Sequence, residues 1–185
     1  MTREAIDVIL NLSGAGVIAG QILLILLILL FALFQTNRKI KRLKPFFNFI
    51  SYNSITFAFL VSVIATIGSL FLSEIAQIPP CRLCWFQRIF MFPLPIILGV
   101  ALIKEDAGVK KYVIPLAAIG SIIAIYHYIL QTAPALALPC ASDAVSCTTK
   151  QIELFGYITI PLMSLTAFLL ILIFLFLAER KTKTN

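Results

Sequence analysis

The sequence has little charge and few of the polar residues that line soluble active sites. Only 12% of its 185 residues are charged, 61% are hydrophobic, and there is a single histidine. A soluble domain needs a water-facing side on each helix or strand, and this composition leaves too little polar surface for one. These proportions exclude a soluble domain and indicate an integral membrane protein.

Two common redox-cofactor motifs are missing. Gly14, Gly16 and Gly20 do not form GxGxxG, and no strand–helix unit surrounds them, which excludes a dinucleotide-binding fold. A c-type haem needs CxxCH, and Trp85 stands where the histidine would be. The net charge is +7, but the basic residues gather beside helix ends, as orientation in a bilayer requires, so we expect no nucleic-acid partner.

Five apolar runs are long enough to cross the hydrocarbon core of a bilayer, which takes about 20 residues. They cover 15–34, 52–73, 85–103, 112–133 and 158–178. We therefore predict an all-α integral membrane protein. Nearly everything outside these runs is short loop, so the residues alone favour a single domain.

Lysine and arginine are unevenly distributed between the loops. Eleven lie after the first, third and fifth runs, and four lie on the other side of the membrane. The positive-inside rule places the eleven in the cytoplasm, so all four cysteines are predicted on the outer, extracytoplasmic face. The first run is followed by basic residues and not by a small-residue cleavage site, which favours a retained helix over a cleaved signal.

The stretch Pro79-Pro80-Cys81-Arg82-Leu83-Cys84 lies where an outer loop turns into the third run. Two prolines suit the start of a helix, so Cys81 and Cys84 are predicted in its first turn. Unpaired N–H groups there stabilise a thiolate and are expected to lower the pKa of the thiols. Helical spacing puts Arg88 on the same face, about 10 Å further in. This pattern favours a redox-active disulfide.

Cys140 and Cys147 lie in the second outer loop with six residues between them. Disulfides are permitted in that compartment, and redox work is favoured over inert staples because a CxxC ring is too small to constrain much chain. Zinc ligands usually come in two close-spaced pairs, and this second pair is spaced too widely. We therefore predict no metal.

A disulfide that is made and handed on returns two electrons, which need an acceptor. The chain has no soluble domain for a flavin or nicotinamide, so the remaining acceptor is a quinone dissolved in the bilayer. Arg88 and His127 are each about 10 Å from the outer ends of the third and fourth runs. Because an arginine inside a membrane is by default a functional candidate, we expect both side chains to bind the quinone head.

Each of these two residues has a plainer interpretation. His127 stands between Tyr126 and Tyr128, a pattern also typical of an aromatic girdle at the membrane interface. The side chain of Arg88 is long enough to reach the outer headgroups. Gln87 is polar at a similar depth, and we assign it no role.

The chain resembles the DsbB family of bacterial disulfide bond formation proteins, including the shorter members often called BdbC. The resemblance rests on the CxxC pair with Arg88 four residues on, the second cysteine pair, AIYHYILQ at 124–131 and FGYITIP at 155–161. It implies a four-helix transmembrane bundle over residues 51–185 in the bacterial cytoplasmic (inner) membrane. Residues 1–50 would then supply one additional N-terminal transmembrane helix and a basic cytoplasmic loop. That bundle would reoxidise an extracytoplasmic DsbA-like, thioredoxin-fold thiol oxidase and deliver the electrons to ubiquinone or menaquinone, with Arg88 and His127 on the quinone side.

The resemblance also implies roles for the cysteines. Cys140 would form the mixed disulfide with the partner, Cys147 would exchange with Cys81, and Cys84 would face the quinone. The second pair is closer together than in the longer family members, so which of Cys140 and Cys147 is attacked first stays open. The task of the first helix is open as well.

Two other readings compete with this one. A vitamin K epoxide reductase-like protein usually has its CxxC after the other loop pair, so the order of the motifs argues against it. The non-enzyme alternative is a small membrane transporter or scaffold subunit stapled by two outer disulfides.

Overall fold

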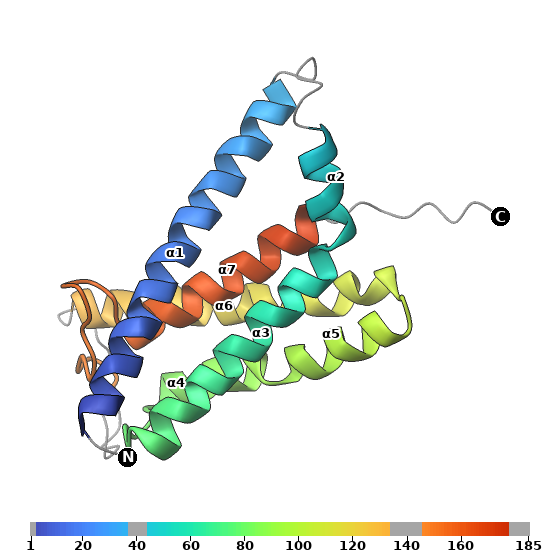
Figure 1. The fold of residues 1–185 in the computed structure, drawn as a ribbon. Coiled ribbons are helices and arrows are strands. Elements are labelled where there is room, and N and C mark those ends of the chain that lie inside the picture. Colours follow the sequence, from blue (N-terminus) through green and yellow to red (C-terminus); the bar gives the residue numbers. More distant parts are fainter. Residues whose placement is uncertain (1–2, 37–43, 134–145, 178–185) are drawn as a thin grey trace.

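The computed structural model describes residues 3–36, 44–133 and 146–177, and the described elements are helical (Figure 1). The described chain also contains a π-helical turn, Phe71–Ile75, and a 3-10 turn, Ala107–Val109. The helices are α1 (Arg3–Thr36), α2 (Lys44–Tyr52), α3 (Ser54–Leu70), α4 (Arg82–Met91), α5 (Pro93–Ile103), α6 (Lys110–Thr132) and α7 (Ile160–Leu177).

Five segments of the described chain are long and apolar enough to cross a membrane. They are Glu4–Ala32, Ser54–Ile75, Arg82–Ile103, Ala107–Thr132 and Ile160–Leu177. Large apolar side chains point outward along them, for example Ile64, Ile96 and Ile122, as a lipid-facing surface requires. The predicted all-α multi-pass membrane protein is confirmed, with span boundaries within a few residues of the apolar runs except in the first, which starts earlier.

The last four spans form a bundle. α6 packs against α7 and α4, while α3 packs against α7 and α5. Their shared core includes Leu94, Leu98, Phe168 and Ile171, all inaccessible to solvent. The segment carrying Cys147 and the start of α4 lie at one end of this bundle, and α2 lies at the other (Figure 1).

The third span is divided in two by proline. α4 ends at Met91, and Pro93 is the first residue of α5. A proline has no N–H to donate and its ring clashes with the preceding turn, which interrupts a helix. The Phe92 N–H still donates to the Arg88 carbonyl at 2.9 Å, so the span continues with a local break. The short α4 then carries the residues of the CxxC motif on a segment of its own.

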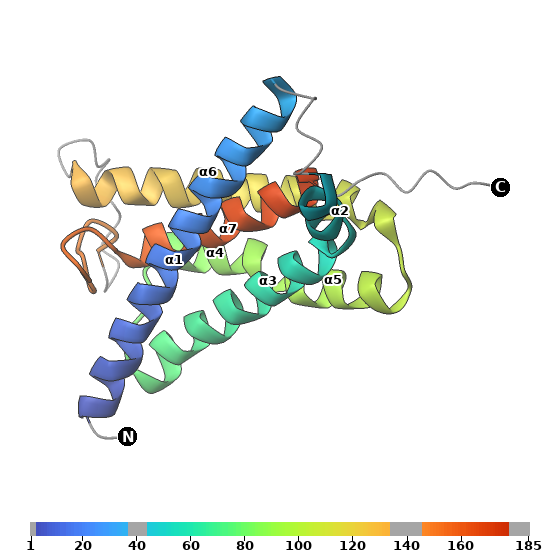
Figure 2. The same cartoon turned by 45° about the horizontal axis from the view of Figure 1, so that its top comes forward.

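α1 lies against α7 and diverges from the bundle toward its own C-terminal end (Figures 1 and 2). Gly20 allows close contact, because a β-carbon there would lie 3.3 Å from Leu170 Cδ1. Gln21 donates to Thr166 Oγ1 at 3.4 Å and accepts from the Tyr157 hydroxyl at 2.9 Å. α1 is thus attached both to α7 and to the segment that follows Cys147.

The close approach of α6 and α7 depends on Gly120. An added β-carbon would lie 2.8 Å from Cε2 of Phe168, a ring with no accessible surface. We predict that Gly120→Ala lowers the unfolding free energy by about 1–3 kcal/mol, as overpacking in a core does. Thermal unfolding in detergent measures this. Gly68→Ala is the control, since nothing lies within 4 Å of its added carbon; equal melting of the two variants would contradict the prediction.

Candidate functional site

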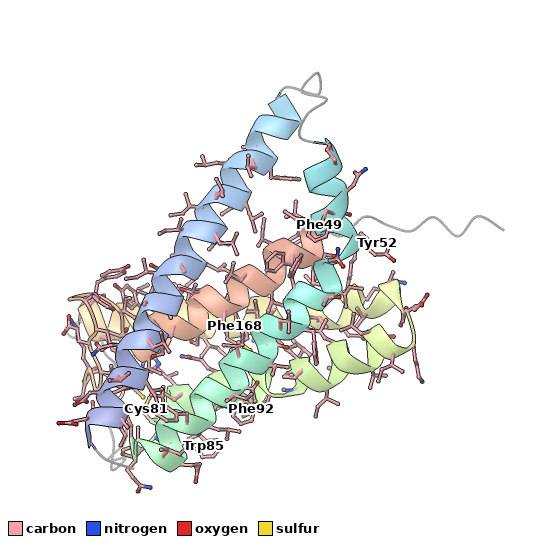
Figure 3. All side chains as sticks on the ribbon, in the orientation of Figure 1. Phe49, Tyr52, Cys81, Trp85, Phe92 and Phe168 are labelled. Carbon is pink, nitrogen blue, oxygen red and sulfur yellow. The ribbon has the colours of Figure 1, made fainter. Side chains whose placement is uncertain are left out.

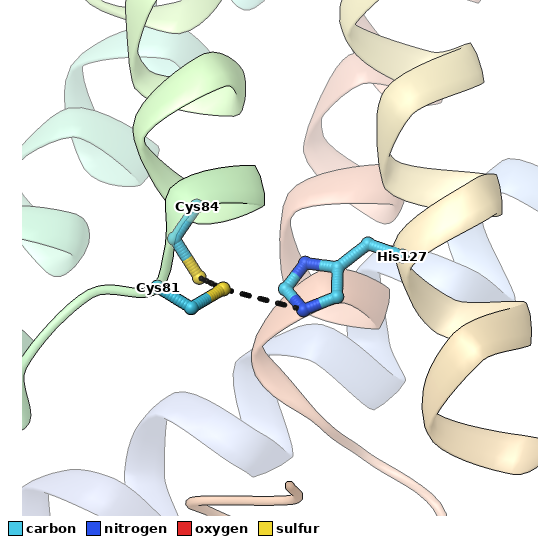
Figure 4. Close-up of side chains that lie close together, drawn as sticks. All are labelled: Cys81, Cys84 and His127. Atoms are coloured by element: carbon cyan, nitrogen blue, oxygen red, sulfur yellow. Dashed lines mark hydrogen bonds between the residues drawn. The ribbon is translucent and has the colours of Figure 1, made fainter. Parts of the chain in front are cut away.

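The CxxC motif begins α4 as the two prolines predict. Cys81 is the N-cap, with extended backbone at φ −72° and ψ 172°, and Cys84 is the third residue of the helix. The Cys81 thiol donates a hydrogen bond to the Cys84 sulfur at 3.4 Å (Figure 4). A disulfide bond is about 2.05 Å long, so the pair is in the dithiol form.

The expected lowering of the thiol pKa is wrong for Cys81. The pKa of this thiol is raised from 9.0 to about 11, first because it donates its hydrogen to Cys84 and second because it is buried. A contact with His127 acts in the opposite direction and is the weaker effect. Cys81 is therefore the hydrogen-bond donor of the pair, and Cys84 is the sulfur that receives the donation.

His127 on α6 faces the two sulfurs. Its Nε2 lies 3.6 Å from Cys81 Sγ (Figure 4), and its side chain is 1% exposed. The neighbouring Tyr126 is 44% exposed and points away from the core. His127 is thus a buried residue of the sulfur site and not a member of an aromatic girdle.

Gln87 completes the polar contacts of His127. Its Nε2 lies 3.0 Å from His127 Nδ1, and its Oε1 accepts a hydrogen bond from the Ser164 hydroxyl on α7. Gln87 is 4% exposed, and the sequence alone predicted no role for it. The spacing held a signal, since Gln87 follows Cys84 by three residues and lies on the same helical face.

Arg88 lies off this buried face and turns toward α3. Its Nε donates to Ser69 Oγ at 2.9 Å and its Nη2 to the Ser69 carbonyl at 2.8 Å. The guanidinium carbon is 5.3 Å from the ring centroid of Trp85 and 5.9 Å from that of Phe92. Figure 3 labels both aromatic residues along this span.

A cavity of about 380 Å³ opens beside Arg88 and is lined by Trp85, Arg88, Ile89, Phe92, Pro93 and Ile96. Most of these side chains belong to the outward, lipid-facing side of the span, as the exposure of Ile89 and Ile96 shows. His127 is not among the lining residues. Arg88 and His127 were expected to meet in one pocket. In the described structure they do not, because the Arg88 side chain and His127 lie on different sides of α4.

Cys147 joins the site from the segment between α6 and α7. It is 5% exposed and forms a buried cluster with Cys81 and Cys84, against which Leu83 and Ile160 pack. Burial raises the pKa of the Cys147 thiol, and the backbone N–H of Leu83 partly offsets this. Cys140 lies outside the described residues.

The donor atoms of Cys81, Cys84 and His127 all lie within 4.8 Å of one another. Sulfur and imidazole nitrogen are the ligands that zinc prefers. The spacing of the two cysteine pairs disfavours zinc, but this cluster does not depend on that spacing. That the chain holds no metal stays a prediction.

Replacing Cys84 tests the hydrogen bond between the two thiols. Cys84→Ala removes the acceptor that raises the pKa of Cys81 most, so this pKa falls from about 11 toward 9.0. Because a fall of one to two units raises the thiolate fraction at pH 9 by about tenfold to fiftyfold, we predict alkylation of Cys81 to be at least about tenfold faster. Mass spectrometry of the alkylated peptide measures it. Cys147→Ala retains the hydrogen bond, and similar rates in both variants would refute this account.

Most of the chain is similar to known proteins. Residues 52–178 match the family of disulfide bond formation protein DsbB. "Disulfide bond formation protein C" of Bacillus subtilis (strain 168) is 48% identical over 124 residues, 66% of this chain and 89% of that protein. A "Probable disulfide formation protein" of Coxiella burnetii (strain CbuK_Q154) is 41% identical over 134 residues, 71% of this chain and 91% of that protein.

A third relative is the "SPbeta prophage-derived disulfide bond formation protein B" of Bacillus subtilis (strain 168), 44% identical over 130 residues, 69% of this chain and 88% of that protein. No solved structure matches significantly. The family match includes α3 to α7 with the CxxC pair, Arg88 and His127, and leaves out α1. The chain belongs to the DsbB family of disulfide bond formation proteins.

Proposed function

We propose that this protein is a quinone-dependent thiol oxidase. It reoxidises an extracytoplasmic, DsbA-like thioredoxin-fold protein and passes the electrons to a membrane quinone, which supports disulfide formation in exported proteins. The observation that carries the proposal is the burial of Cys147 against the CxxC pair. Thiols from two separate outer segments thereby come within reach of disulfide exchange.

Electrons would pass from the partner through the cysteines of this chain by thiol–disulfide exchange, which we call the thiol relay. The partner's dithiol loses two electrons and two protons as it becomes a disulfide, and a disulfide of this chain takes up both. Cys147 lies beside Cys81, so a disulfide can pass between the second pair and the first by thiolate attack. Cys140 or Cys147 receives the partner's thiolate, and Cys84, the sulfur that accepts the Cys81 hydrogen bond, is the thiol from which the electrons leave for the quinone.

The cavity beside Arg88 suits the head of a quinone. Its volume of about 380 Å³ lies in the range of small-molecule pockets, and aromatic and aliphatic side chains surround one guanidinium. Ser69 engages two of the five N–H donors of Arg88, which fixes the side chain within the membrane. The remaining donors are suited to a quinone carbonyl oxygen. A bound quinone supplies the capacity to accept two electrons and two protons; ubiquinone and menaquinone share this chemistry.

Residue placement also supports the proposed orientation in the bacterial cytoplasmic membrane. The start of α4 and the segment with Cys147 lie at one end of the bundle, opposite α2 (Figure 1). α5 ends at Ile103 and is followed by Lys104, and α2 begins at Lys44. Basic residues therefore flank the end predicted to face the cytoplasm, and the described cysteines lie at the other.

The alternative, a transporter or scaffold stapled by two outer disulfides, needs no contact between the cysteine pairs. Here Cys147 lies in one buried cluster with Cys81 and Cys84. Two independent disulfide staples would not require this contact, whereas disulfide exchange between the two cysteine pairs does. We therefore favour the thiol oxidase.

Variants of Arg88 test the acceptor site. Among the described residues that line the cavity, Arg88 is the only cation. Arg88→Ala is expected to raise the KM for quinone at least tenfold, because a hydrogen bond from a charged group is lost. Arg88→Lys keeps the charge without the planar fork and is expected to fall between wild type and Arg88→Ala. The assay follows oxidation of a reduced DsbA-like protein at varied quinone concentration.

In the same assay Cys84→Ser is expected to abolish turnover at every quinone concentration. Unchanged quinone KM in Arg88→Ala would remove the proposed role of Arg88 while leaving the thiol relay intact. Turnover that persists in Cys84→Ser would contradict the proposed function as a whole.

A further inference from the structure

Four polar contacts form a row from α7 to the start of α4. The Ser164 hydroxyl donates to Gln87 Oε1, and Gln87 Nε2 lies 3.0 Å from His127 Nδ1. His127 Nε2 lies 3.6 Å from Cys81 Sγ, and the Cys81 thiol donates to Cys84 Sγ at 3.4 Å. Gln87 and His127 are 4% and 1% exposed, so water does not take the place of these partners.

Hydrogen counting sets the direction of the central contact. The amide nitrogen of glutamine only donates, and a neutral imidazole has one N–H and one acceptor nitrogen. Because Gln87 donates to Nδ1, that nitrogen is the acceptor, and the ring hydrogen sits on Nε2. His127 then directs an N–H toward Cys81, whose own hydrogen points to Cys84.

We propose that Gln87 is a positioning residue that holds His127 in the Nε2–H form, so that every hydrogen bond from Ser164 to Cys84 is donated toward Cys84. Hydrogen bonds in such a chain polarise one another, and the strengthening is greatest where water is excluded. The last acceptor, the Cys84 sulfur, is thereby the place in the row where negative charge is best stabilised. The Nε2–H form of His127 follows from the orientation of the Gln87 amide, whereas its benefit to turnover rests on the proposed function.

The residue type at position 87 decides which hydrogen-bonding group faces His127 Nδ1. A glutamate has only acceptor atoms when ionised, so it would take a hydrogen from Nδ1 and leave Nε2 with a lone pair toward Cys81. A leucine would offer Nδ1 nothing. Glutamine, with its oxygen held by Ser164, presents a donor to Nδ1.

The opposite polarity is the competing arrangement. Ser164 Oγ also lies 3.0 Å from the Pro161 carbonyl, and donation there would allow the Gln87 amide to turn around. His127 would then carry its hydrogen on Nδ1 and offer the Nε2 lone pair to the cluster of Cys81 and Cys84. That form suits a metal ligand or a base, whereas the Nε2–H form offers the sulfurs a hydrogen. The position of one hydrogen decides between them.

The single histidine makes this hydrogen directly measurable. Full-length protein with ¹⁵N-labelled histidine, reduced and held in detergent micelles at a pH where the imidazole is neutral, gives one pair of ring-nitrogen signals. We expect the proton on Nε2 in the wild type. In Gln87→Glu we expect it on Nδ1, and in Ser164→Ala a mixture of the two. A wild-type proton on Nδ1 would overturn the proposal, whether or not any variant folds.

A second measurement follows the reactivity of the Cys84 sulfur. Alkylation of Cys84 in the reduced protein is expected to slow about tenfold in Gln87→Glu. The Nε2 lone pair of His127 then takes the Cys81 hydrogen, and the Cys84 thiolate loses the hydrogen bond that stabilises it. Gln131→Leu is the matched control: Gln131 is a buried glutamine one turn beyond His127 that donates to the Thr149 carbonyl at 3.4 Å, and both readouts should stay at wild-type values. An unchanged Cys84 rate together with a reversed proton in Gln87→Glu would refute the sulfur's dependence on His127.

Neither measurement uses a quinone or a partner protein. The proposal about His127 therefore stands or falls separately from the proposed electron acceptor. If the proton lies on Nε2 but quinone never oxidises the thiols, the proposed function fails and the positioning role of Gln87 remains.

Discussion

The hydrogen bond from Cys81 to Cys84 at the start of α4 is the interaction on which the rest of this structure depends. It assigns different roles to two identical side chains, because one sulfur keeps its hydrogen and the other receives it. Burial makes the difference large, since neither sulfur has water to compensate for a missing partner. The groups that surround the pair, His127 and Cys147, act on sulfurs that are already unequal.

The bilayer explains why these groups are concentrated in one place. A polar side chain within an apolar bundle is costly unless it is paired, so polar residues either reach an interface or bond to one another. Gln87, His127 and Ser164 do the latter at the cysteine end of the bundle. Arg88 instead bonds to Ser69 on α3 and faces an apolar cavity. The adjacent residues Gln87 and Arg88 of α4 thus face different neighbours, Gln87 the polar groups beside the sulfurs and Arg88 the proposed acceptor site.

Much of the fold could be predicted from the sequence, and the site only in part. Uncharged runs specify spans because a bilayer has a fixed thickness, and Pro79 and Pro80 mark the start of α4. The helices that pack against α4 could not be predicted from the sequence. Adjacent residues on a helix point about 100° apart, so Gln87 and Arg88 face different neighbours, and nothing in the sequence says that α6 lies on one side and α3 on the other. The burial of Cys147 depends on the same packing.

The proposed function requires that a buried pair of thiols at the start of α4 deliver its electrons to a membrane quinone. The most direct measurement is anaerobic mixing of the fully reduced, purified protein with a quinone in detergent, with thiols and quinone followed together. The account predicts that two thiols disappear for each quinone reduced, with no other oxidant present. Thiols that persist beside an unreduced quinone would contradict it.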